Sequence, residues 1–269
     1  MPRLDVGHIT LNILDEGSGP PLLFIPGLVG LLNAWEFQVA EFSKRYRCIS
    51  LDHRGAGDSD KPEDPGEYST AHIAKDVVAL LDTLDIEKTH VVGTSTGGAV
   101  LQNLGIDYGD RFRCCVFSNT WTAADEYIMR VQTMRKFIAL DRGQEEYVKV
   151  SSLFTNGANQ FRYNLDKVLE LEERSLKTVA PVEILAARLD MTMNHNRLDE
   201  ISKIKNPSLI IASRDDSTVP SYFSEDLHDA IEGSKLILVD EGGHYSYRRH
   251  PEMWNGHVSE FFSANEGRV

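Results

Sequence analysis

Short apolar runs alternate with longer amphipathic runs from the start of the chain to about residue 120, a pattern typical of strands joined by crossover helices. In the run 69–84, apolar residues such as Ile73, Val77, Leu80 and Leu84 recur at spacings of three and four, which predicts a helix with one buried face. The apolar runs predict strands at residues 8–15, 21–25, 46–51, 89–92 and 113–119. We therefore expect an α/β fold with a mostly parallel central sheet flanked by helices.

The pattern changes between residues 122 and 205, where the strand signal disappears. Four helical segments are predicted there, at residues 125–140, 144–154, 160–176 and 182–189. Strands return at 208–213 and 235–239, so the helical insertion interrupts one sheet-based domain. The sequence predicts a core domain formed by residues 1–121 and 206–269, with an all-helical cap at residues 122–205.

The acidic composition narrows the expected partners. Lys and Arg number 28 against 41 Asp and Glu, which gives a formal net charge of -13 at pH 7. This charge opposes binding to nucleic acid or an anionic membrane, so the expected partner is a small molecule, with a homodimer as an open option. We expect a cytoplasmic protein, because no apolar leader or membrane-spanning stretch is visible and three cysteines in apolar runs indicate reduced thiols.

The strongest chemical signal is a G-x-S-x-G motif at residues 93–97, placed between an apolar strand and a helix-like run. This context predicts a nucleophile elbow, a turn so sharp that side chains larger than glycine would collide. The turn would hold Ser95 in a strained conformation with its hydroxyl exposed. The alternative interpretation is a turn that is merely rich in glycine and serine.

A serine nucleophile needs a base, and the base needs an acid that fixes its tautomer. His244 follows two glycines at a predicted strand end late in the chain, a context that leaves its imidazole free to reach the serine. Asp215 and Asp216 follow the strand 208–213, and the residues alone do not decide which of them orients His244. Residues 24–30 also give the end of a predicted strand followed by a glycine-containing loop.

These segments, together with D-x-R-G-x-G-x-S at residues 52–59, resemble the α/β-hydrolase superfamily in their order and over residues 6–262. The chain is similar to the branch of aminoacrylate hydrolases, enol-lactonases and small-molecule carboxylesterases. The residues that carry this similarity are I-P-G-L-V-G at 25–30 with Trp35 downstream, S-N-T-W at 118–121, Arg130 and Arg135 on one cap helix, and D-D-S-T-V-P at 215–220.

The resemblance implies a catalytic triad of Ser95, Asp216 and His244, with Asp215 bracing the turn. It also implies that backbone N–H groups of Leu28 and Thr96 form the oxyanion hole, with Val29 as the near alternative to Leu28. The histidine that the family usually carries before Gly27 is Pro26 here. Asp52 and Arg54 are expected to brace loops near the elbow.

The resulting hypothesis is a serine hydrolase that cleaves an ester, lactone or amide-type bond of a small metabolite through an acyl-enzyme. We expect its pocket between the elbow and the cap, lined by Leu28, Val29, Trp121, Tyr245 and Arg130. The alternative for Trp121 and Tyr245 is that they pack the cap hinge. Arg130 and Arg135 are expected to form surface ion pairs, with a clamp for a substrate carboxylate as the alternative.

Two other functions remain compatible with these residues. One is a carbon–carbon hydrolase of ring-cleavage products, and the other is a non-enzymatic small-molecule receptor that retains the triad. We expect no metal, because no His, Cys or acidic residues show ligand spacing, and no cofactor, because the glycine run at 93–98 lacks the lysine of a phosphate loop.

Overall fold

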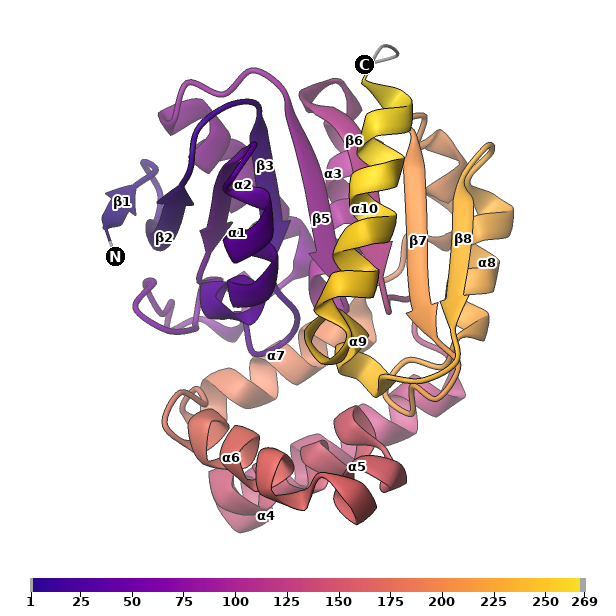
Figure 1. The fold of residues 1–269 in the computed structure, drawn as a ribbon. Coiled ribbons are helices and arrows are strands. Elements are labelled where there is room, and N and C mark those ends of the chain that lie inside the picture. Colours follow the sequence, from indigo (N-terminus) through magenta and orange to yellow (C-terminus); the bar gives the residue numbers. More distant parts are fainter. Residues whose placement is uncertain (1, 267–269) are drawn as a thin grey trace.

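The structure is a computed structural model that describes residues 2–266. These residues form an eight-stranded sheet with helices on both faces (Figure 1). The strands are β1 (Arg3–Asp5), β2 (Thr10–Glu16), β3 (Pro21–Ile25), β4 (Arg47–Leu51), β5 (Thr89–Thr94), β6 (Phe112–Ser118), β7 (Ser208–Ser213) and β8 (Lys235–Val239). Their order is β1-β2-β4-β3-β5-β6-β7-β8. The pairings of β1 with β2 and of β2 with β4 are antiparallel, and the other five are parallel. The expected mostly parallel sheet is confirmed.

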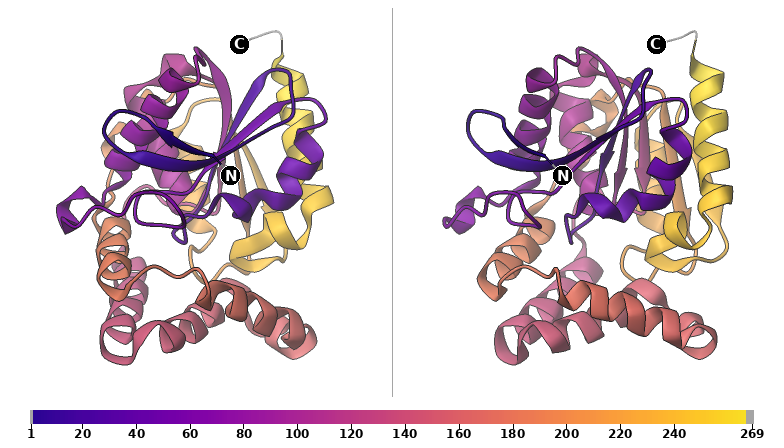
Figure 2. Two further views of the ribbon diagram at one scale, coloured as in Figure 1. Left: turned by 90° about the vertical axis from the view of Figure 1, so that its left-hand side faces the viewer. Right: turned by 60° about the vertical axis from the view of Figure 1, so that its left-hand side comes forward.

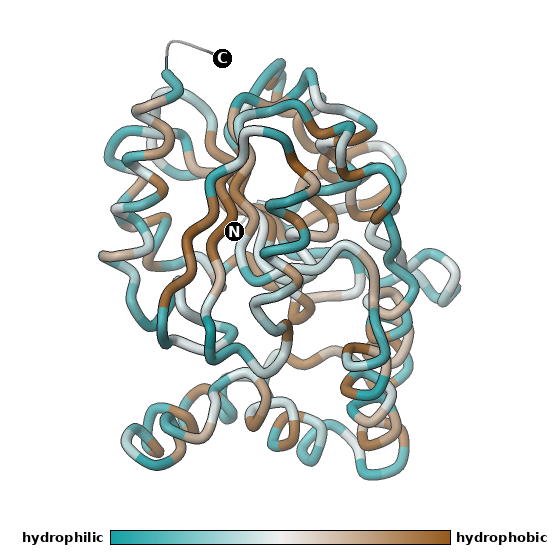
Figure 3. The backbone as a smooth tube through the Cα atoms, turned by 90° about the vertical axis from the view of Figure 1, so that its right-hand side faces the viewer, coloured by the Kyte–Doolittle hydropathy of each residue, from teal (hydrophilic) through white to brown (hydrophobic). Residues whose placement is uncertain are grey.

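Helices pack against the two faces of the sheet (Figures 1 and 2). On one face lie α1 (Glu36–Phe42) and α10 (Pro251–Asn265), whose Phe42, Trp254 and Phe262 belong to one buried cluster with the strands. On the other face lie α2 (Thr70–Thr83), α3 (Thr96–Asp107) and α8 (Tyr222–Ala230), around a second cluster. Figure 3 shows the hydrophobic strands between these layers. The shorter elements are η1 (Leu32–Trp35), η2 (Pro65–Glu67), η3 (Gly109–Arg111), η4 (Leu198–Lys203), η5 (Gly243–Tyr245) and α9 (Ser246–Arg249).

Helix α2 follows directly from its sequence. Its apolar stripe, which includes Ile73, Val77 and Leu80, is buried in the core, as expected for a 3.6-residue period. The Ser69 hydroxyl accepts a hydrogen bond from the backbone N–H of His72 at 3.0 Å, so it satisfies a free N–H group at the start of the helix.

Four helices between β6 and β7 lie across the carboxyl ends of the parallel strands (Figure 1). They are α4 (Glu126–Asn156), α5 (Ala158–Tyr163), α6 (Leu165–Leu176) and α7 (Val182–Asn194). We call residues 126–194 the cap. Gly143 interrupts α4 with a φ of 83°, which accounts for the two helical segments that the sequence predicts there. This placement supports the proposed division into a core and a helical cap.

Two details of the predicted elements were wrong. The helix predicted over residues 160–176 is two helices, because Asn164 has a non-helical φ of -138° and ψ of 36°. The strand β1 was not predicted, since three mostly exposed residues carry no alternating apolar pattern.

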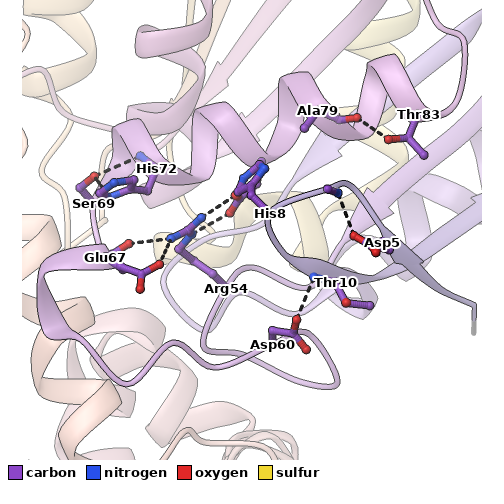
Figure 4. Close-up of polar contacts among 12 residues, drawn as sticks. Asp5, His8, Thr10, Arg54, Asp60, Glu67, Ser69, His72, Ala79 and Thr83 are labelled. Atoms are coloured by element: carbon purple, nitrogen blue, oxygen red, sulfur yellow. Dashed lines mark hydrogen bonds and ion pairs between the residues drawn. The ribbon is translucent and has the colours of Figure 1, made fainter.

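Asp52 and Arg54 hold the loops that lead to the site. The Asp52 carboxylate accepts hydrogen bonds from the Asn12 amide at 2.7 Å and from the Leu32 backbone N–H at 2.9 Å. Arg54 makes a buried two-point ion pair with Asp76, at 2.8 Å and 2.6 Å. Figure 4 shows Arg54 between Glu67 and His8. These contacts join α2 to the loops after β3 and β4, as the family resemblance implies.

Replacing Asp76 by alanine is expected to destabilise the protein by about 3–5 kcal/mol, because it leaves the Arg54 guanidinium buried without its counter-charge. Glu67→Gln is the matched control, since the Glu67 side chain is 50% exposed and its 3.3 Å contact with Arg54 is worth less than about 1 kcal/mol. Urea unfolding followed by circular dichroism measures both changes in the free energy of unfolding. Equal costs for the two variants would contradict a structural role for the Arg54–Asp76 pair.

Candidate active site

Ser95 lies at the predicted sharp turn between β5 and α3, with a φ of 53° and a ψ of -121°. Positive φ is costly for a residue with a Cβ, so the surrounding structure must hold this conformation. The Ser95 N–H donates to the Ser118 carbonyl at 2.8 Å, and the Thr120 hydroxyl donates to the Ser95 carbonyl at 2.8 Å. A Cβ at Gly97 would clash with the Ile25 carbonyl, which explains why the motif needs glycine there.

His244 and Asp216 form a buried pair at the carboxyl ends of the neighbouring strands. The distance between His244 Nδ1 and Asp216 Oδ2 is 2.7 Å. Donation from Nδ1–H to this carboxylate leaves Nε2 as the proton acceptor of a neutral imidazole. The Asn119 amide donates to the same Asp216 oxygen at 2.7 Å, and the Thr218 N–H donates to the other at 2.7 Å. These donors fix the orientation of the carboxylate.

Asp215 has a different set of contacts. Its carboxylate accepts hydrogen bonds from the backbone N–H groups of Gly243 at 2.9 Å and Gly242 at 3.3 Å. It therefore holds the loop that carries His244, while Asp216 contacts the imidazole itself.

The two proposed oxyanion donors belong to the loop after β3 and to the start of α3. Thr96 begins α3, where a backbone N–H has no acceptor within the helix. Leu28 belongs to a turn closed by a hydrogen bond of 2.9 Å from the Gly30 N–H to the Gly27 carbonyl. Leu28, Val29 and Thr96 all line the same cavity as Ser95, so both backbone N–H assignments remain proposals that this geometry supports.

A cavity of about 330 Å³ lies between the elbow and the cap. Ser95, His244 and Tyr245 line it from the core, and Gln132, Arg135 and Thr155 line it from the cap. Burial raises the pKa of Tyr245, so its phenol is neutral near neutral pH. The cavity brings together the predicted nucleophile, base, oxyanion donors and Tyr245.

Trp121 and Arg130, two residues expected in the pocket, do not line this cavity. Trp121 is buried with Ile128, Val219 and Phe223 at the entry to the cap, because its large apolar ring is covered by the neighbouring helices. The Arg130 side chain is 79% exposed and pairs with Glu126 at 2.8 Å on the same helix. Each therefore takes the other role stated from the sequence, hinge packing for Trp121 and a surface ion pair for Arg130.

Arg135, the other cap arginine, is not the surface ion pair that the sequence suggested. It is only 5% exposed and lines the cavity. Its position five residues after Arg130 places it on a different side of α4, since five residues span about 500° of helical rotation.

Arg188, on α7, is a second buried cap arginine, and sequence reasoning missed it. It is 1% exposed and donates hydrogen bonds to the backbone carbonyls of Leu28 and, at 2.7 Å, Arg54. Burial lowers its pKa to about 10, so it stays charged near neutral pH. Arg188 thus fixes the loop that presents the Leu28 N–H, and its apolar surroundings in the sequence carried no signal of this contact.

Arg188→Met is expected to lower kcat about 10- to 100-fold with a smaller change in KM, because the oxyanion loop loses the donor that positions it. Steady-state kinetics on a chromogenic ester measures this split. Arg197→Met is the control, since Arg197 is another part-buried arginine but binds Asp107 and Glu200. A variant that loses stability at unchanged kcat would show that Arg188 only supports the fold.

No group of three or more His, Cys or acidic side chains within residues 2–266 is arranged to hold a metal ion. Across the same residues, no helix has the length and apolar character needed to cross a membrane.

A mostly parallel sheet with a serine elbow and a carboxylate-bound histidine on one cavity defines a hydrolase of the α/β type. The chain belongs to the alpha/beta hydrolase fold family, whose model matches residues 20–251. This finding confirms the resemblance seen in the sequence.

The chain is similar over almost its full length to proteins named "Putative carbamate hydrolase RutD". The one from Azorhizobium caulinodans is 30% identical over 256 residues, covering 95% of this chain and 96% of its own. The one from Caulobacter vibrioides is 30% identical over 269 residues, covering 98% and 100%. The enol-lactonase from Burkholderia xenovorans LB400 shares the fold, with a TM-score of 0.89 at 23% identity over 97% of this chain and 100% of its own.

Proposed function

We propose that this hydrolase cleaves an ester, lactone or amide-type bond of a small metabolite through an acyl-enzyme on Ser95. The observation that carries this proposal is the 2.7 Å contact between His244 and Asp216 beside a cavity that Ser95 also lines. A histidine held in this tautomer can accept the proton that makes a serine hydroxyl nucleophilic.

In the proposed first step, the Ser95 hydroxyl attacks a carbonyl carbon while His244 Nε2 takes its proton. The N–H groups of Leu28 and Thr96 hold the negative charge that develops on the carbonyl oxygen. His244 then gives the proton to the leaving group, and the acyl group stays on Ser95. In the second step His244 takes a proton from water while the water oxygen attacks the acyl carbon. The bond to Ser95 then breaks, the Ser95 oxygen takes the proton from His244, and the acid is released.

The cavity and the relatives indicate the class of substrate. A volume of about 330 Å³ lies at the lower end of the range for ligand pockets, which favours a small molecule. The relatives named as carbamate hydrolases add the carbamate, a carbonyl between oxygen and nitrogen, to the bonds worth testing. We propose that the partner is such a metabolite and not nucleic acid or a membrane.

The test is covalent capture of the nucleophile. Mass spectrometry of the protein treated with a fluorophosphonate should show one adduct on Ser95, and p-nitrophenyl acetate should give a burst of one p-nitrophenol per chain. Ser175→Ala, which removes another hydroxyl from the same cavity wall, should keep both signals. A small-molecule receptor would bind ligands without a burst, and an adduct elsewhere would refute the proposed nucleophile.

A further inference from the structure

The buried Arg135 has hydrogen-bond partners but no counter-charge. Its guanidinium donates to the Gln132 amide oxygen at 2.8 Å, the Ser151 hydroxyl at 3.0 Å and the Tyr147 hydroxyl at 2.9 Å. All three acceptors are neutral, and within residues 2–266 no carboxylate lies in ion-pair distance of Arg135. A buried charge without a counter-charge is costly, so a protein that retains one gains by placing an anion beside it.

The guanidinium keeps capacity to bind such an anion. It carries five N–H groups in a planar fork, and three of them are used by Gln132, Ser151 and Tyr147. One N–H on each terminal nitrogen is left without an acceptor in the described part of the chain. The three bonds fix the plane of the guanidinium, so the two remaining N–H groups can donate to an anion without further ordering of the side chain.

The other basic residues of the cavity wall differ from Arg135. Arg174 pairs with Glu170 at 2.8 Å, Lys177 with Glu173 at 2.7 Å, and Arg248 with Glu36 at 2.6 Å. Each of these cations is already neutralised by a carboxylate near solvent. Arg135 is the cation of this wall whose charge is both buried and unbalanced within residues 2–266.

A small side chamber of about 80 Å³ adjoins the cavity at Arg135. The two spaces share Leu28, Arg135, Thr155 and Tyr245 in their walls. The chamber is also lined by Arg188, a second buried cation, and by the half-buried Glu172, which forms no ion pair with either arginine in the described residues. Its volume leaves room for a carboxylate group, given that a cavity needs about 10–15 Å³ by this measure to hold one water molecule.

We propose that Arg135 and this side chamber form an anion-binding site that selects substrates carrying a carboxylate away from the scissile bond. That the bound anions are substrates rests on the proposed function, and their chemical class is that of carboxylates. The carboxylate binds the free edge of the Arg135 guanidinium, and the scissile carbonyl lies at Ser95. Arg135 is then the residue that determines specificity, although it takes no part in the chemical step.

The test compares charged and neutral esters of equal length. Mono-p-nitrophenyl esters of succinate, glutarate and adipate are matched with p-nitrophenyl butanoate, pentanoate and hexanoate. The wild-type protein should prefer at least one charged ester by kcat/KM. Arg135→Met should lower that charged-to-neutral ratio about 10- to 100-fold, the loss expected when a charge-assisted hydrogen-bonded pair is removed. Arg130→Met, which removes the same charge from the exposed side of α4, should leave the ratio unchanged.

Calorimetry separates this site from the catalytic proposal. Titration of glutarate should give binding to the wild-type protein that is lost in Arg135→Met and kept in Arg130→Met. Binding with this pattern in a protein that hydrolyses no ester supports the anion site and refutes the proposed function. Hydrolysis with equal kcat/KM for charged and neutral esters overturns the anion site and leaves the proposed function standing. That wild-type ratio decides the question even if Arg135→Met does not fold, and Arg135→Lys, which keeps the charge without the fork, should give an intermediate ratio.

Discussion

Ser95→Ala is expected to lower kcat/KM about 10⁴- to 10⁶-fold on any ester that the wild-type protein hydrolyses. The substitution removes the hydroxyl that forms the acyl-enzyme, and His244 and Asp216 contribute little without it because the three residues act as a unit. The change in kcat/KM is measured by steady-state hydrolysis of p-nitrophenyl acetate, with the rate in buffer alone subtracted.

The Ser95→Ala substitution is compatible with the backbone conformation at this position. Alanine keeps the Cβ, so the cost of the 53° φ is the same in both proteins. The free energy of unfolding should therefore change by less than about 1 kcal/mol, and denaturant unfolding serves as the control. A folded Ser95→Ala protein with more than a few per cent of wild-type activity would rule out Ser95 as the nucleophile.

The elements that position Ser95 could be predicted from the sequence because their signals are local. The strand before the elbow is a continuous apolar run, and the glycines of the motif are required by contacts within a few residues or with the adjacent strand β3. The parallel sheet then places the loops after β5, β7 and β8 at the same edge, where Ser95, Asp216 and His244 lie. The local sequence pattern and the sheet topology are therefore enough to predict that these three residues lie at one edge of the sheet.

The cap side of the cavity could not be predicted in the same way. Arg130 and Arg135 lie on one helix and have the same chemistry, yet one is exposed and the other is buried. The difference depends on how α4 packs against the core and on which hydroxyl groups of its second half reach Arg135. Asn119 and Arg188 were missed for the same reason, since their partners Asp216 and Leu28 are 97 and 160 residues away.

Asp216 and Asp215 fix His244 in different ways. Asp216 is held by Asn119, Thr218 and Val219, and Asp215 holds the glycines before His244. The imidazole is thus fixed from two sides, by an acid at its Nδ1 and by a brace on its backbone. Two adjacent aspartates therefore have separable roles, one electrostatic and one structural.

Asp216→Asn is expected to lower kcat/KM about 10⁴-fold while the protein stays folded. An asparagine amide facing His244 Nδ1 donates a hydrogen bond there, so the imidazole proton moves to Nε2 and the base can no longer accept the Ser95 proton. The same kinetic assay measures the loss, and circular dichroism checks the fold. Asp215→Asn is the matched control, because it keeps an oxygen that can accept the 2.9 Å hydrogen bond from Gly243 and should cost less than about tenfold. If Asp215→Asn were the more damaging of the two, the acid that orients His244 would have to be reassigned, since the 2.7 Å contact of Asp216 would then not be the one used in catalysis.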